Sequence, residues 1–256
     1  MIRREDNEGW VLITQYDHAG LARRIMKHWG NEEFSKPDPY EEVVFAVKEH
    51  DSGWVPWDSE PKVNPSNGYP ANFMEMSTND QVEIWSRCYK PFVGDHPYAA
   101  ALIALHFMKF NQKAINKNDA NGLATNLQNE MADYIAGTLD IPLSGSQLLN
   151  IPSNIKANLR YLQVSDIISL TLCHGWQSID MDQVPTGHGE LTKTLQINSE
   201  DGFNFTIDPY PLDEPVVECS IVGKKISMKS FSSNDEYRSA LKSAETTTLK
   251  FSMNRK

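Results

Sequence analysis

The chain has 256 residues, of which 40% are hydrophobic and 23% charged, a composition typical of a soluble globular protein. Its formal net charge of −10 argues against a general nucleic-acid-binding or anionic-membrane surface. Three widely spaced cysteines give no disulfide framework. No apolar run suits a signal peptide or reaches the roughly 18 residues of a membrane span. We therefore expect a cytoplasmic protein with a small-molecule partner, without nucleic-acid or membrane partners.

The first elements in chain order are a hairpin and an amphipathic helix. Residues 2–4 and 10–13 have the apolar character of two short strands. A helix is then predicted over 14–29, because its apolar residues recur at spacings of three and four. His18 stands in that apolar stripe, on the face that we expect to be buried.

The second predicted helix, 39–51, ends on the dipeptide His50-Asp51, with His50 on its apolar face. Residues 52–76 contain four prolines, two glycines and two tryptophans, and they predict a long loop. Loops of this length in compact domains are often functional. The aromatic residues favour an ordered loop here.

Further helices are predicted in the middle of the chain. Their apolar stripes contain His106, in a helix that begins at Pro97, and Asp166, in a helix over 153–174. Two more helices are predicted over 77–92 and 119–138.

The character of the chain changes after Gly175. Residues 191–231 alternate between apolar and polar side chains with the period of a strand, and a short helix and a last strand follow. We expect an α+β protein that is mainly α, a bundle of about six helices with a small antiparallel β-sheet at the C-terminus. The expected parts are a helical metal-binding body, 1–175, with the N-terminal hairpin, and a β tail, 190–256, packed on it. The hairpin is itself a candidate to join the tail's sheet.

His18, His50, His106 and Asp166 each interrupt an apolar stripe. A charge or ring nitrogen in a core costs several kcal/mol when it is unpaired. One shared metal ion would satisfy all four, together with Asp51 beside His50. Two or three imidazoles with two carboxylates suit a divalent ion such as Mn, Fe, Co, Ni, Zn or Mg. The alternative is that each residue is an ordinary hydrogen-bonded core group, with Asp166 paired to Arg160.

Two more residues are candidates for catalysis. Lys109 follows His106 by three residues and could reach a bound anion, although it equally suits a solvated helix surface. Asp58, in the long loop, is a candidate proton-transfer group or a simple loop cap.

The ordered residues His18, His50-Asp51 and Asp166 resemble the ligand set of the HD superfamily of metal-dependent phosphohydrolases. Residues 162–169 look like that superfamily's last ligand helix, and His-Asp-Ser-Gly-Trp resembles its His-Asp-x-Gly-Lys, with Trp54 in place of lysine. The resemblance implies an all-helical body that holds a divalent metal.

The chain as a whole resembles an uncharacterised bacterial family of the domain-of-unknown-function type. The segments that carry this likeness are 14–18, 50–58, 97–102 and 165–170. The likeness names no substrate.

Three functions follow as expectations. The first is a metal-dependent hydrolase of a phosphorylated small molecule or nucleotide. The second is an HD-type di-iron oxygenase, for which His106 leaves room. The third is a non-catalytic metal- or ligand-binding protein, which the missing lysine favours.

Overall fold

The structure is a computed structural model that describes residues 1–7, 9–117, 119–189 and 191–256. Its longer helices begin and end close to the residues where the apolar periodicity of the sequence begins and ends. In the described residues the helices are α1 (Gln15–Lys27), α2 (Tyr40–Glu49), α3 (Val55–Ser59), α4 (Thr78–Tyr89), α5 (Pro97–Lys117), α6 (Leu123–Leu139), α7 (Ser153–His174) and α8 (Asn234–Ser243).

The strands of the described residues form one large sheet and one small hairpin. The large sheet has the order β1-β2-β8-β9-β7-β6-β5, and β3 pairs with β4. The strands are β1 (Ile2–Asp6), β2 (Gly9–Ile13), β3 (Leu143–Ser144), β4 (Gln147–Leu148), β5 (Ser178–Pro185), β6 (Thr192–Asn198), β7 (Asn204–Asp208), β8 (Val216–Ile226) and β9 (Glu245–Arg255).

The prediction of a mainly helical protein with a small antiparallel C-terminal sheet is wrong. Within the described residues the large sheet has seven strands, and β7 pairs with β9 in parallel. The N-terminal hairpin belongs to it, since Trp10 of β2 pairs with Ile226 of β8. A pairing between segments so far apart in the chain leaves no trace in local periodicity, so the sequence could not reveal the size of the sheet.

Strand β5 was missed for a more local reason. Its register against β6 shifts between Met181 and Val184, so a bulge interrupts the alternation of buried and exposed side chains. Bulges insert an extra residue into one strand and bend it. The period-two signal is therefore lost in the middle of this strand.

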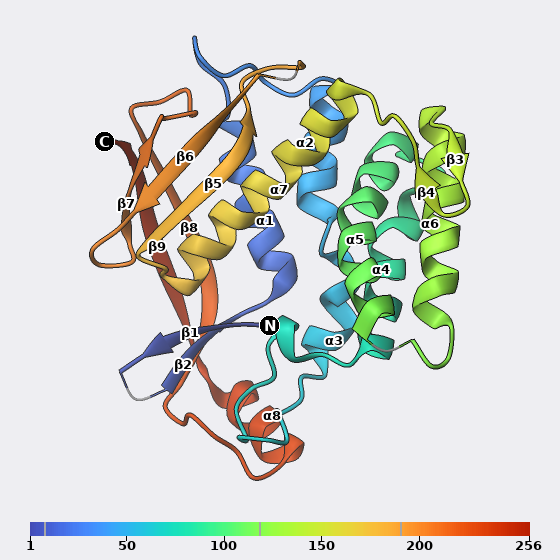
Figure 1. The fold of residues 1–256 in the computed structure, drawn as a ribbon. Helices are drawn as coiled ribbons and strands as arrows, with labels where there is room; N and C mark the ends of the chain where they lie inside the picture. The colour runs from blue at the N-terminus through green and yellow to red at the C-terminus, as the bar shows by residue number, and fades with distance from the viewer. Residues whose placement is uncertain (8, 118, 190) are drawn as a thin grey trace.

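Helices α1 and α7 form the layer between the sheet and the other long helices (Figure 1). Helix α7 contacts β1 and β5, α1 contacts β8, and α2 and α5 pack on the far side of α7. One buried cluster joins Ile2 of the hairpin, Leu21 of α1, Leu102 of α5 and Phe251 of β9. The N-terminal turn of α1 and the middle of α7 thus lie where the two layers of helices meet.

The long predicted loop is partly structured. Residues 52–54 and 73–75 form single 3-10 turns, and α3 lies between them. Among the described residues, no helix combines the length and the apolar character that a membrane crossing would need.

A candidate metal centre

His18 is placed by the start of α1. The Thr14 side chain accepts a hydrogen bond from Asp17 N and caps the helix, which leaves His18 buried in the first turns. The Ser169 hydroxyl donates to the backbone oxygen of His18 and also lies 2.8 Å from His18 Nδ1. Because that hydroxyl proton is already used, the serine oxygen accepts from Nδ1–H. The lone pair of His18 is therefore on Nε2.

The ring of His50 is held in the same tautomer by a different contact. It stands at the C-terminal cap of α2, where its Nδ1 lies 2.8 Å from the backbone oxygen of Val47. A carbonyl oxygen can only accept, so Nδ1 carries the proton and Nε2 the lone pair. A partner of this kind on the far nitrogen is what orients metal-ligating histidines.

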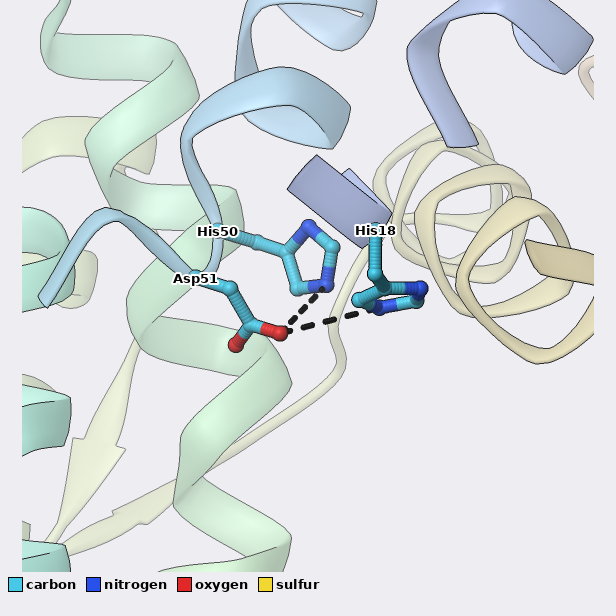
Figure 2. Close-up of side chains that lie close together, drawn as sticks. All are labelled: His18, His50 and Asp51. Atoms are coloured by element: carbon cyan, nitrogen blue, oxygen red, sulfur yellow. Dashed lines mark ion pairs between the residues drawn. The ribbon is translucent and has the colours of Figure 1, made fainter. Parts of the chain in front are cut away.

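Two carboxylates face these lone pairs. Asp51 follows His50, the C-cap of α2, and its Oδ2 lies 3.5 Å from His50 Nε2 and 3.6 Å from His18 Nε2 (Figure 2). Asp166, on α7, places Oδ1 3.0 Å from His18 Nε2 and 3.5 Å from His50 Nε2. The structure thus brings together His18, His50, Asp51 and Asp166 from α1, α2 and α7 and from the turn after α2.

The group is deeply buried. His18 and His50 are each 1% exposed, and neither Nε2 has a hydrogen-bond partner. A lone pair opposite a carboxylate oxygen is an arrangement of two acceptors, which needs a cation between them. That cation is either a proton on each ring or a metal ion.

The pKa values of the group reflect this need for a cation. Burial would lower the pKa of His50, but Asp51 and Asp166 outweigh it and raise the pKa to about 9. Burial raises the pKa of Asp51. Burial also opposes ionisation of Asp166, yet the adjacent rings of His18 and His50 hold the pKa of this carboxyl well below its usual range. Without an ion, protons on the imidazoles must compensate these carboxylates.

The ligand atoms of His18, His50 and Asp51 all lie within 4.8 Å of one another, so this buried group could hold a metal ion. Two imidazole nitrogens with orphaned lone pairs and a carboxylate are suitable donors for a borderline divalent ion. The residues present therefore fit the metal that the sequence predicts, whose identity the donor set leaves open.

His106, on α5, lies next to this group. Its Nε2 is 3.8 Å from Asp166 Oδ2, and its buried Nδ1 has no hydrogen-bond partner. Burial lowers the pKa of His106 to about 4, although Asp166 opposes this, so the ring is neutral at pH 7. Its role as a ligand stays a prediction.

The two catalytic candidates lie in different surroundings. Lys109 is exposed on α5 and forms no ion pair within the described ranges. Asp58, on α3, is buried, forms an ion pair with the Met1 amino group at 2.9 Å and accepts from Gln15 N at 2.7 Å. Asp58 therefore fastens the start of α1, while catalytic roles for both residues stay untested.

Sequence reasoning missed the residues that orient the ligands. Ser169 follows Asp166 by three residues, one helical turn along α7, and this spacing of a small polar residue was the available signal. The steric role of Gly53 was also not predicted. A Cβ atom there would lie 2.3 Å from the backbone oxygen of Ile84, so only glycine lets the turn after Asp51 approach α4 this closely.

Fold and site together define an α+β protein with a seven-stranded mixed sheet, within the described residues, and a buried His–Asp group between its helices. Residues 1–228 match the model of the family described as "Protein of unknown function (DUF3891)", and the chain belongs to this family. No curated protein and no solved structure matched the chain. Membership of an unknown-function family is thus confirmed, whereas the HD-like ligand pattern stays a prediction.

Proposed function

We propose that the protein is a metal-dependent hydrolase of a phosphorylated small molecule, such as a nucleotide. The observation that carries the proposal is the pair of buried imidazole lone pairs, on His18 and His50, that face carboxylate oxygens with no donor between them. The ligand order His, His-Asp, Asp, which resembles that of the HD phosphohydrolases, supports the choice of reaction.

In this proposal His18, His50, Asp51 and Asp166 hold the ion, and Ser169 and the Val47 carbonyl keep both rings in the ligating tautomer. Mn, Fe, Co, Ni and Zn all suit nitrogen and oxygen donors, and Mg is a weaker match. A bound divalent ion supplies an activated water and polarises a phosphoryl oxygen.

The charge balance is compatible with an anionic substrate. Two ionised carboxylates with two neutral imidazoles leave a divalent ion electrically neutral, so the centre would not repel a phosphate group. The Asp166 side chain is 13% exposed, the most exposed of the four, so solvent reaches the group from the side of α7. We infer that a phosphate group approaches from that side.

The test is phosphate release from a panel of phosphate monoesters and nucleotides, with each metal added in turn to chelator-treated protein. His50→Ala should abolish release. His188→Ala is the matched control, because His188 is exposed and forms no ion pair with any other described residue. His28 is a poorer control, since it forms a second, exposed group with Asp213 and Glu214. Metal-bound protein without turnover on the whole panel would contradict the hydrolase and favour a non-catalytic binding protein.

A second candidate function rests on Asp166 itself. Its Oδ1 faces His18 and His50, whereas its Oδ2 faces His106. A carboxylate with imidazoles at both oxygens could help to hold two ions, and a di-iron oxygenase would need a site of this kind. Protein purified without added metal would then contain about two iron ions per chain, and metal analysis that finds a single ion removes this candidate.

A further inference from the structure

A second candidate binding site lies between α7 and the strands β5 and β6. A cavity of about 370 Å³ is lined there by residues of all three elements. None of the metal-centre residues lines it, and Arg160 precedes Asp166 by six residues, about 9 Å along the helix. The cavity is large enough for a small organic ligand.

The polar lining of this cavity is cationic. Lys156 and Arg160 both line it, and the described lining residues include no aspartate or glutamate. Lys156 is exposed and forms no ion pair with any residue in the described ranges. Among the described lining residues, these two cations therefore have no carboxylate partner.

Two hydrogen bonds hold the Arg160 guanidinium in place, and they do not use all of its N–H donors. One Nη donates to Gln163 Oε1 at 3.3 Å, and the other donates to the backbone oxygen of Asp182 at 2.5 Å. The Asp182 carboxylate accepts a hydrogen bond from Thr194, and its charge partly offsets the effect of burial, which lowers the pKa of Arg160. Since a guanidinium has five N–H donors in a planar fork, a fixed Arg160 keeps donors for a further acceptor.

The strand that forms the opposite wall is distorted at this point. Gln183 lines the cavity and has a φ of 58°, in the left-handed region that non-glycine residues avoid, at the bulge of β5. Such strain is concentrated at functional sites, and bulges redirect side chains. Leu159 and Pro185 add an apolar part to the lining.

We propose that this cavity binds a small organic anion, with its phosphate or carboxylate group on Lys156 and Arg160 and its apolar body against Leu159 and Pro185. The site is independent of the metal centre and of the proposed hydrolase reaction. The amide of Gln183 would bind a polar group on the same ligand.

The experiment uses the full chain with chelator present, so that no anion binds through a metal ion. Phenyl phosphate, benzoate and the neutral benzyl alcohol are titrated by NMR or calorimetry. We expect saturable binding of an anion, with amide shifts at the start of α7 and in β5, and none for benzyl alcohol. The tighter of the two anions identifies the head group.

Two variants and one control make the test specific. Lys156→Gln, at an exposed position that should leave the fold intact, and Arg160→Gln should each weaken binding about tenfold, the usual scale for a charged contact. Lys113→Gln, at an exposed position on α5, changes the net charge equally and should leave binding unchanged. Three results would overturn the proposal: no saturable anion binding, equal loss in the Lys113 variant, or binding that survives both cavity variants but is lost in His50→Ala.

Discussion

At the scale of single residues, the centre depends on which ring nitrogen of each histidine carries the proton. One contact decides this for each ring: the Ser169 hydroxyl for His18 and the Val47 carbonyl for His50. The interrupted apolar stripes of the sequence pointed to His18, His50 and Asp166, because a buried charge demands a partner. They could not reveal Ser169, because a buried serine hydroxyl can find a hydrogen-bond partner in many different surroundings.

Ser169→Ala should weaken metal binding by about 10- to 100-fold, the usual effect of losing a group that orients a ligand. His18 would remain in place but its ring could adopt the other tautomer. The matched control is Ser165→Ala on the same helix, whose hydroxyl donates only to backbone oxygens of α7. Metal titration of both variants checks this, and equal affinities would show that Ser169 has no orienting role.

The protein without metal should lose stability as the pH rises from about 6.5 to about 9. The pKa of His50 is raised from 6.5 to about 9 in the folded protein, so its contribution is complete below 6.5 and is lost as the pH rises through 9. Saturating metal should remove this loss, because the ligating rings are then neutral throughout. Thermal melts across this pH range, with chelator or with metal, measure the loss of stability. If the melting temperature of the His50→Gln variant in chelator falls as steeply with pH as that of the wild type, His50 is not the group responsible.

At the scale of elements, the turn after α2 positions Asp51. The helices that carry the other ligands were predictable: α7 spans the residues that its apolar pattern indicated, and α1 begins one residue after the start of the predicted range. The close approach of this turn to α4 was not predictable, because it depends on the position of a helix distant in sequence. Strand β5 was not predictable for a different, local reason, because its bulge interrupts the alternation of buried and exposed side chains.

Gly53→Ala should displace that turn and reduce metal affinity, since the new Cβ would meet the backbone of Ile84 at 2.3 Å. Overpacking of this kind usually costs about 1–3 kcal/mol of folding stability. Gly94→Ala is the control, because a Cβ there meets nothing within 4 Å. Denaturant melts and metal titrations are compared, and a Gly53→Ala protein that matches the wild type in both would disprove the close contact.

At the scale of the whole molecule, strands from the N-terminal and C-terminal parts of the chain pair in one sheet. The N-terminal hairpin pairs with β8, and the buried guanidinium of Arg4 donates to Leu172 O at the end of α7 and to Gly202 O. The alternation in residues 191–231 indicated strands there. The alternation alone does not show which strand pairs with the N-terminal hairpin, and in the structure this strand is β8.

A chain truncated after residue 185 should be insoluble. It would retain α1, α7, β5 and the hairpin of β1 and β2. It would lose β8, which pairs with β2, and β6, which pairs with β5. Buried side chains such as Val11 and Leu21 would lose part of their covering. Solubility and metal content of the purified fragment are the readouts, and a soluble fragment that binds metal would identify the tail as an independent domain.

The central claim, that one ion is shared between α1, α2 and α7, is tested most directly by metal content per chain after dialysis. Wild type and His188→Ala should retain about one ion or more, and should melt at a higher temperature with metal than without it. His50→Ala, Asp51→Ala and Asp166→Ala should each lose the ion and this stabilisation. The loss in Asp166→Ala is the most telling result, because Asp166 is far in sequence from the other ligands. If the wild type binds no divalent ion, or the three variants bind it equally well, the shared metal centre does not exist.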